Sequence, residues 1–264
     1  MVSKALQLLS LLPQKPGEFY DRLTAIVEVR WEVSRGRAAW HHALKAQEDI
    51  RLLSCSLGFD CDAWLKETAL AVVETRIGEG QADLPRDAPF GSFHNGDSLL
   101  GRICYATARS LRPMLVVETG VCYGVTSSYL LQALEVNEEG RLHSIDLPPL
   151  GKNGDEYVGW LVPNELREGW KLHRGSSRRL LPSLLRELGQ IDLFVHDSLH
   201  TYRNMRDEFD VAWPALCPGG VLVSDDIERN SAFLELSTRP DVSHSAVFKE
   251  QNKDSLVGIA VKAK

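Results

Sequence analysis

The sequence lacks the patterns that mark several large classes of protein. Its five cysteines are isolated, and no two of them have the C-x-x-C spacing of a zinc knuckle. No apolar run is long enough to cross a bilayer. Pro13 interrupts the short apolar run near the N-terminus, where we expect an amphipathic helix rather than a signal peptide. Lysine and arginine form no long block, which argues against a nucleic-acid-binding protein.

Length and composition are those of an ordinary globular protein. The chain has 264 residues, of which 44% are hydrophobic and 25% are charged, so it can bury a full core. Its net charge of -6 disfavours nucleic acid as the main partner. An odd number of isolated cysteines suits a reducing compartment. We therefore expect a cytoplasmic protein with neither a membrane nor a nucleic acid as its partner.

The most informative pattern lies over residues 115–146. A short apolar run ends at Glu118, Gly120 and Gly124 follow, and a helical pattern leads to a second β-like run that ends at Asp146. Strand, glycine turn, helix and strand make half of a nucleotide-binding α/β unit. Glycines allow a sharp turn and a close ligand approach, and the helix N-terminus offers unpaired N–H groups. An acid at the end of the second strand can accept the hydroxyls of a ribose.

The glycine spacing narrows the choice of ligand. The spacing is G-V-C-Y-G rather than G-x-G-x-x-G, which disfavours an NAD dehydrogenase because close approach of a pyrophosphate is not provided for. The acid ahead of the first glycine suits a cationic ligand better than a phosphate. An ordinary βαβ turn with a solvated acid is the alternative. The pattern Glu118-Thr-Gly120-x-x-x-Gly124 with Asp146 resembles the cofactor motif of class I S-adenosylmethionine (SAM) methyltransferases.

The rest of the chain alternates β-like and helical patterns. Further strands are expected near residues 170–173, 191–195, 221–224, 244–249 and 256–261. Strands that alternate with helices predict a doubly wound, mostly parallel sheet whose ligand site lies at the carboxyl ends of the strands. Residues 1–90 read as helical, and we expect a helical cap or an oligomerisation segment there. A cofactor-binding domain is expected over residues 91–264.

Acidic residues follow four of the expected strands. They are Glu118, Asp146, Asp197, and Asp225 with Asp226. A single Asp after a strand often caps the next helix, and that interpretation stays open for each one alone. The strands before Asp197 and Asp225 are neighbours in a doubly wound sheet, so three carboxylates would converge and repel by roughly 1 kcal/mol or more. Ligands that are all oxygen favour Mg²⁺, with Ca²⁺ or Mn²⁺ as alternatives.

Two segments carry a more specific resemblance. IDLFVHDSLHTY (191–202) and PGGVLVSDD (218–226) resemble metal-dependent O-methyltransferases of the catechol type, and more closely their bacterial relatives that modify sugars and natural products. The resemblance runs from about residue 93 to the C-terminus and implies a seven-stranded class I methyltransferase sheet. It implies that Asp197, Asp225 and Asp226 hold Mg²⁺, although catechol enzymes have Asp-Asn at the last pair. Residues 95–97 resemble the segment that closes over the cofactor's methionine end.

The resemblance also implies cofactor-binding and catalytic residues. Those implied to bind SAM are Glu118, Gly120, Gly124, Thr126, Asp146, Ser176, Ser177 and Asp197. His200, on the expected first turn of a helix, takes the place of the catalytic lysine of catechol enzymes, and Asp197 is the second catalytic candidate. A neutral imidazole, with an ordinary pKa of about 6.5, can accept a hydroxyl proton at pH 7. A packing role for His200 and a helix cap at Ser176 and Ser177 are the alternatives.

These observations predict a SAM-dependent, Mg²⁺-dependent O-methyltransferase. Its substrate would be a small molecule with vicinal oxygens, such as a sugar diol or a catechol, because a metal can bind two neighbouring oxygens. Two alternatives use the same fold: a metal-binding, hydroxylase-like enzyme of antibiotic biosynthesis, and a non-catalytic partner protein. The strand-end acids argue against the second, since a scaffold gains nothing from their repulsion. A homo-oligomer formed through the N-terminal helices is a further expectation.

Overall fold

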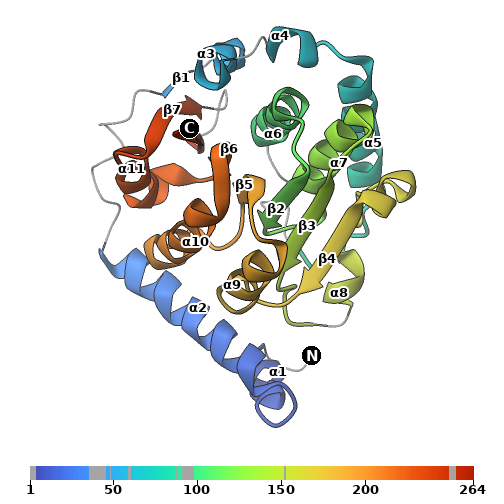
Figure 1. The fold of residues 1–264 in the computed structure, drawn as a ribbon. Helices are drawn as coiled ribbons and strands as arrows, with labels where there is room; N and C mark the ends of the chain where they lie inside the picture. Colours follow the sequence, from blue (N-terminus) through green and yellow to red (C-terminus); the bar gives the residue numbers. More distant parts are fainter. Residues whose placement is uncertain are drawn as a thin grey trace.

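A single twisted sheet with helices on both faces forms the body of the protein (Figure 1). The computed structural model describes residues 4–35, 46–47, 49–58, 61–86, 88–90, 98–151, 153–249 and 254–264. Within these residues the strand order is β1-β7-β8-β6-β5-β2-β3-β4. The strands are β1 (Ala46–Gln47), β2 (Leu115–Thr119), β3 (Arg141–Asp146), β4 (Trp170–Arg174), β5 (Ile191–His196), β6 (Leu216–Ser224), β7 (Val242–Lys249) and β8 (Leu256–Lys262).

The predicted seven-stranded, mostly parallel sheet is confirmed by strands β2 to β8. Only the pairs of β8 with β6 and with β7 are antiparallel, so the expected terminal pair of strands is also present. The two-residue strand β1 was not predicted, because residues 1–90 were expected to be helical throughout. It pairs with β7 and so covers backbone groups that an edge strand would otherwise leave open.

One face of the sheet carries the helices that precede and follow β2. They are α3 (Leu53–Leu57), α4 (Cys61–Trp64), α5 (Thr68–Ala82), α6 (Ser98–Leu111) and α7 (Val125–Asn137). Leu53 and Val73 are fully buried in the same apolar cluster as Leu130 of α7 and Val116 of β2. Residues 53–77 therefore share the core of the domain expected over residues 91–264.

The opposite face carries the helices of the second half of the chain. They are α9 (Ser177–Leu188), α10 (Tyr202–Ala215) and α11 (Ala232–Ser237), while the short helix α8 (Gly154–Tyr157) follows β3. Leu181 of α9, Phe209 of α10 and Phe233 of α11 pack with Phe194 of β5 in a second apolar cluster. The apolar stripes of α9 and α10 thus hold both helices flat on the sheet.

The first two helices occupy a different position. Helices α1 (Lys4–Leu11) and α2 (Pro16–Arg35) run beside α9 and α10 rather than over the face of the sheet (Figure 1). Ion pairs and hydrogen bonds join α2 to both neighbours, through Asp21 to Arg179 and through Glu32 to the backbone of Tyr202. No helix among the described residues is long and apolar enough to cross a membrane.

Candidate cofactor cleft and acidic site

A cleft of about 690 Å³ lies at the carboxyl ends of the central strands. Its volume is in the range of sites that hold a small molecule or a cofactor. Five residues expected to bind the cofactor line it together: Gly120, Asp146, Ser176, Ser177 and Asp197. They come from the ends of β2, β3, β4 and β5, which is where ligands of open α/β sheets bind.

The glycine turn after β2 forms one wall of this cleft. Gly120 has a φ of +85°, a conformation that glycine adopts without strain. Its N–H donates to the carbonyl of Ile145 in β3 (2.9 Å), and the N–H of Asp197 donates to the carbonyl of Thr119 (2.8 Å). These bonds fix the turn between its two neighbouring strands, so that its backbone faces the cleft.

Asp146 closes β3 and reaches back to the glycine turn. Its Oδ2 accepts the N–H groups of Val121 (2.7 Å) and Cys122 (2.8 Å). Burial raises the pKa of Asp146, while these two backbone donors oppose that effect. Two hydrogen bonds use about half of the acceptor capacity of a carboxylate, which leaves the remainder for hydroxyls of a ligand in the cleft.

Three residues expected to bind the cofactor do not line the cleft: Glu118, Gly124 and Thr126. Strand β2 continues to Thr119, between β3 and β5, so Glu118 lies inside the sheet instead of at the strand's tip. Gly124, with a φ of +88°, opens α7, and Thr126 donates from Oγ1 to Asp197 Oδ2 at 3.4 Å. Of these three residues, Thr126 contacts a residue that lines the cleft, Asp197.

Glu118 is fully buried and partly unsatisfied. Its Oε2 accepts hydrogen bonds from the hydroxyls of Ser127 (2.7 Å) and Ser144 (2.6 Å), and Oε1 has no hydrogen-bond partner among the described residues. Burial raises the pKa of Glu118 to about 7, against the two hydroxyl donors that lower it. A carboxyl group in this position is therefore close to half protonated near neutral pH.

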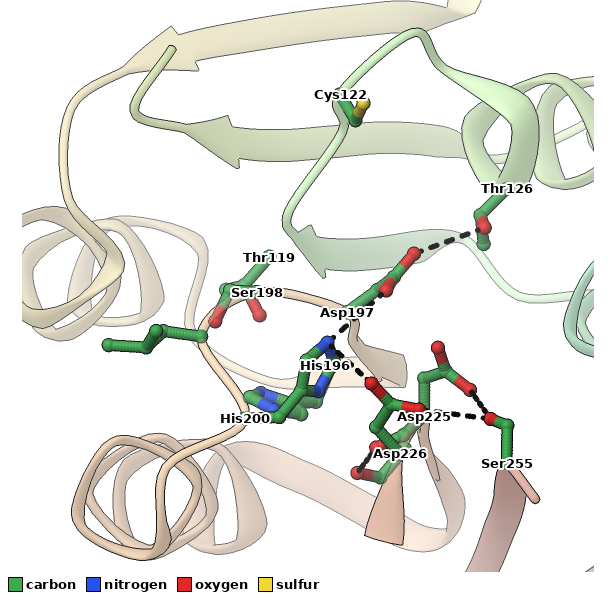
Figure 2. Close-up of polar contacts among 12 residues, drawn as sticks. Thr119, Cys122, Thr126, His196, Asp197, Ser198, His200, Asp225, Asp226 and Ser255 are labelled. Carbon is green, nitrogen blue, oxygen red and sulfur yellow. Dashed lines mark hydrogen bonds and ion pairs between the residues drawn. The ribbon is translucent and has the colours of Figure 1, made fainter. Parts of the chain in front are cut away.

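Acidic side chains converge beside the cleft, at the ends of β5 and β6 (Figure 2). Asp197, His200 and Asp225 each offer an atom within 4.8 Å of the others. Asp226 lies at the edge of this group: its Oδ2 is 3.7 Å from His200 Nε2 and 2.7 Å from an Arg229 nitrogen. Ser255, just before β8, donates to Asp226 Oδ1 at 3.0 Å. Asp197 belongs to both the cleft and this acidic site.

The electrostatics of the acidic site fit a bound cation. Burial raises the pKa of Asp225 to about 8, and the charge of Asp226 adds to this effect. Burial and the charge of Asp225 likewise raise the pKa of Asp197 well above its usual value. Buried carboxylates that repel one another are stabilised when a metal ion neutralises them. Carboxylate oxygens suit Mg²⁺, Ca²⁺ or Mn²⁺, and an imidazole within the group also suits a transition metal.

The sequence analysis placed His200 on the first turn of a helix, and this prediction was wrong. His200 lies in the loop ahead of α10. The helix begins at Tyr202, because Thr201 is its N-cap and accepts the N–H of Asn204 through its side chain (3.3 Å). Burial lowers the pKa of His200 to about 3, with a further contribution from His196. The imidazole is therefore neutral at pH 7, and the same burial makes it a weaker base than an exposed histidine.

Glu208 supports this loop and was not singled out from the sequence. Its two oxygens accept from Thr119 Oγ1 (2.5 Å) and Ser198 Oγ (2.7 Å), and Oε2 lies 2.7 Å from His196 Nδ1. Burial opposes ionisation, but His196 and the hydroxyl donors lower the pKa of Glu208 to about 2. The sequence does contain one indication that Glu208 is buried. At helical spacing it lies on the same face of α10 as the buried apolar residues Met205 and Ala212.

The segment at residues 95–97, which was expected to close over the cofactor, lies outside the described residues. The other expected site residues all lie within the described part of the chain.

The family described as a methyltransferase domain (Methyltransf_24) matches residues 117–227. This range contains the glycine turn, Asp146 and the acids after β5 and β6. The comparison with curated protein sequences finds no match.

Solved structures with a similar fold include several O-methyltransferases. An O-methyltransferase from Bacillus cereus in complex with S-adenosylhomocysteine (SAH) is 15% identical, with a TM-score of 0.52 over 75% of this chain and 92% of that chain. TomG from Streptomyces achromogenes, an O-methyltransferase of tomaymycin synthesis in complex with SAM, is 19% identical, with a TM-score of 0.51 over 75% and 91%. A putative caffeoyl-CoA O-methyltransferase from Staphylococcus aureus is 13% identical, with a TM-score of 0.54 over 72% and 92%.

The fold is the one that class I methyltransferases share, and a methyltransferase-domain model matches residues 117–227 within it. The resemblance noted in the sequence is thereby confirmed for the fold.

Proposed function

We propose that this protein is an O-methyltransferase that uses SAM and a divalent cation, Mg²⁺ in the first place, to methylate a hydroxyl group. Its substrate is a small molecule with two neighbouring oxygens, such as a catechol or a sugar diol. The observation that carries this proposal is the position of Asp197, which lines the cleft and also belongs to the acidic site. The methyl donor and the acceptor oxygen would therefore meet at one residue.

The cleft offers the groups that SAM requires. When bound, SAM supplies a methyl group on a positively charged sulfur, which is already activated for transfer. Asp146 would accept the ribose hydroxyls, the backbone at Gly120 would lie against the ligand, and Ser176 and Ser177 would lie near the adenine. The buried charge of Asp197 favours a cation beside it. These residues align the reactants, and alignment contributes much of the rate of such a transfer.

The acidic site offers the ligands that a divalent cation requires. Asp197, Asp225 and Asp226 would hold it through carboxylate oxygens. When bound there, Mg²⁺ would supply Lewis-acid chemistry that lowers the pKa of a substrate hydroxyl. Asp226 is also paired with Arg229 and Ser255, which fix the orientation of its carboxylate.

His200 is the base in this proposal. Its imidazole is neutral at pH 7, and the charge of Asp226 raises its basicity, so it would take the proton from the acceptor hydroxyl at Nε2. A new bond then joins the oxygen to the methyl carbon, the bond from that carbon to sulfur breaks, and SAH leaves as a neutral thioether. Asp226, at 3.7 Å from Nε2, would stabilise the charged imidazolium that results.

Transfer of a labelled methyl group tests this function. SAM labelled at its methyl group is incubated with catechols and with sugars that carry vicinal hydroxyls, once with Mg²⁺ and once with EDTA. Label in an acceptor with Mg²⁺ but not with EDTA supports the proposal. Label that is transferred equally in EDTA contradicts the metal requirement. SAM bound without any transfer would favour the hydroxylase-like or non-catalytic alternatives.

A further inference from the structure

The wall of the cleft that faces the strand ends is made by the N-terminal helices. Lys4, Ala5 and Leu8 of α1 and Asp21, Arg22, Ala25, Ile26 and Glu28 of α2 line the same 690 Å³ cleft as Asp146 and Asp197. Without these two helices the cleft would lack one side. Their position therefore bears on how a ligand enters and leaves.

Ion pairs join α2 to the last residue of β4 and to the first turn of α9. Asp21 forms a bidentate pair with Arg179, with N···O distances of 3.0 and 2.9 Å. The two other acid–arginine pairs are Glu18 with Arg174 at 2.8 Å and Glu28 with Arg178 at 2.7 Å. One face of α2 thus presents three acids to three arginines of the β4–α9 region.

These helices dock without a buried apolar side chain among their described residues. No residue of α1 is buried, and among the described side chains of α2 the buried one is Glu28. Helices normally dock by burying an apolar stripe, at roughly 25 cal/mol for each Å² removed from water. Partly exposed ion pairs contribute only about 0–1 kcal/mol each, and salt screens them. The attachment of α1 and α2 is therefore weak and ionic.

The same helix also holds two loops of the cleft. Asp21 Oδ2 accepts the hydroxyl of Ser176 (2.7 Å), and Arg22 donates to the carbonyl of Pro148 (2.7 Å), just after Asp146. When α2 is in place, these two bonds hold Ser176, which is expected near the adenine, and the loop after Asp146, which is expected at the ribose. When α2 moves away, both loops lose a hydrogen-bond partner.

We propose that α1 and α2 form a lid over the cofactor cleft, held closed by the pairs with Arg174, Arg178 and Arg179, and that this lid opens to admit SAM and to release SAH. Asp21 and Arg22 are positioning residues of the closed state. The identity of the ligand rests on the proposed function, whereas the opening of the lid does not.

The double variant Arg174→Gln/Arg179→Gln tests the lid, because neither arginine lines the cleft. Arg102→Gln is the matched control, since it removes a partly exposed pair with Glu74 that lies outside the cleft. In the ligand-free protein, amide hydrogen exchange of α2 should be roughly three- to tenfold faster in the double variant than in the wild type. The control should exchange at the wild-type rate.

The rate of SAH release gives a second readout, followed by stopped-flow fluorescence at 50 and 500 mM NaCl. Release from the wild type should be several-fold faster at high salt, and release from the double variant should be fast at both concentrations. Asp21→Arg should speed the exchange of α2 further, and Asp21→Arg/Arg179→Asp should slow it again, since the charges are then restored in reverse.

Unchanged exchange of α2 in every variant would overturn the proposal and make the helices a fixed wall. Faster exchange without any change in SAH release would also overturn it, because the helices would then not control access. If SAH does not bind at all, the proposed function fails, and hydrogen exchange still decides whether the helices open.

Discussion

The carbonyl oxygen of Asp197 lies so close to Gly120 that a Cβ atom on Gly120 would be only 1.9 Å from it. No flexible side chain can move to relieve this contact, because the atom belongs to the backbone. The contact joins the glycine turn after β2 to the first residue of the acidic site after β5. The cofactor cleft and the acidic site are therefore built as one unit, at the junction of two neighbouring strands.

Gly120→Ala should consequently damage both sites at once. The added methyl group would push the turn and Asp197 apart, and it would also strain a backbone with a φ of +85°. Gly189→Ala is the control, since Gly189 has a similar φ of +77° but no atom within 4 Å of the new Cβ. We expect Gly120→Ala to lower SAH affinity and Mg²⁺ affinity by at least about tenfold. Gly189→Ala should keep wild-type affinities, and a normal calorimetric affinity of Gly120→Ala for either ligand would refute the coupling.

Much of this site was predictable from the sequence, because its residues mark the ends of strands. Short apolar runs that finish in Asp146, Asp197 or Asp225 are local patterns, and parallel strands bring their carboxyl ends to one edge. The strands expected near residues 170–173 and 191–195 are β4 and β5 with one more residue each. Local sequence therefore placed three acids correctly without knowledge of their contacts.

The parts that escaped prediction depend on contacts between distant segments. Glu118 was placed at a strand tip, but β3 and β5 pair with β2 on both sides through residue 119 and draw it into the sheet. Glu208 binds the side chain of Thr119, 89 residues away, and no local pattern encodes that pairing. The N-terminal helices were interpreted as a cap or a subunit contact. Their sequence does not show which distant arginines form ion pairs with the acids of α2.

Glu118→Gln should make stability less dependent on pH. The pKa of Glu118 is raised from 4.5 to about 7 in the fold, so the folded state favours the protonated acid. Its contribution is fully present below about pH 4.5 and is lost as the pH rises through 7, by up to about 3 kcal/mol. Glutamine does not titrate, so the variant should gain stability relative to the wild type over this range.

Urea unfolding in EDTA at pH 5 and at pH 8 measures this difference. Glu156→Gln, which replaces an exposed acid, is the control and should follow the wild type at both values of pH. A stability difference between Glu118→Gln and the wild type that is equal at pH 5 and pH 8 would contradict the prediction, because Glu118 would then not titrate between these values.

Asp225→Asn should separate two effects of the acidic site, which are the destabilisation of the metal-free protein and the binding of Mg²⁺. Removing one of the repelling, buried carboxylates should raise the melting temperature of the metal-free protein. Saturating Mg²⁺ should stabilise the wild type by about 2.7 kcal/mol at one hundred times its dissociation constant, and the variant by much less. Differential scanning calorimetry with Mg²⁺ and with EDTA tests both parts. Equal gains from Mg²⁺ in the two proteins would rule out Asp225 as a ligand.

His200→Ala should distinguish a base from a metal ligand, because His200 lies within the acidic group. As a base, its loss should lower kcat by about 10²- to 10⁴-fold and leave Mg²⁺ affinity close to that of the wild type. As a ligand, its loss should weaken Mg²⁺ binding first. Activity assays at saturating Mg²⁺, together with calorimetric Mg²⁺ titrations, decide between the two roles.

The most direct test of the central claim is a calorimetric titration of SAH into the wild type and into Asp146→Asn, with Glu156→Gln as an exposed control. The wild type should bind one SAH with micromolar affinity. Asp146→Asn should bind at least about tenfold more weakly, because an amide cannot accept the ribose hydroxyls and the two backbone N–H groups as the carboxylate does. Absence of SAH binding to the wild type, or equal binding by Asp146→Asn, would contradict the account of this cleft as the SAM site.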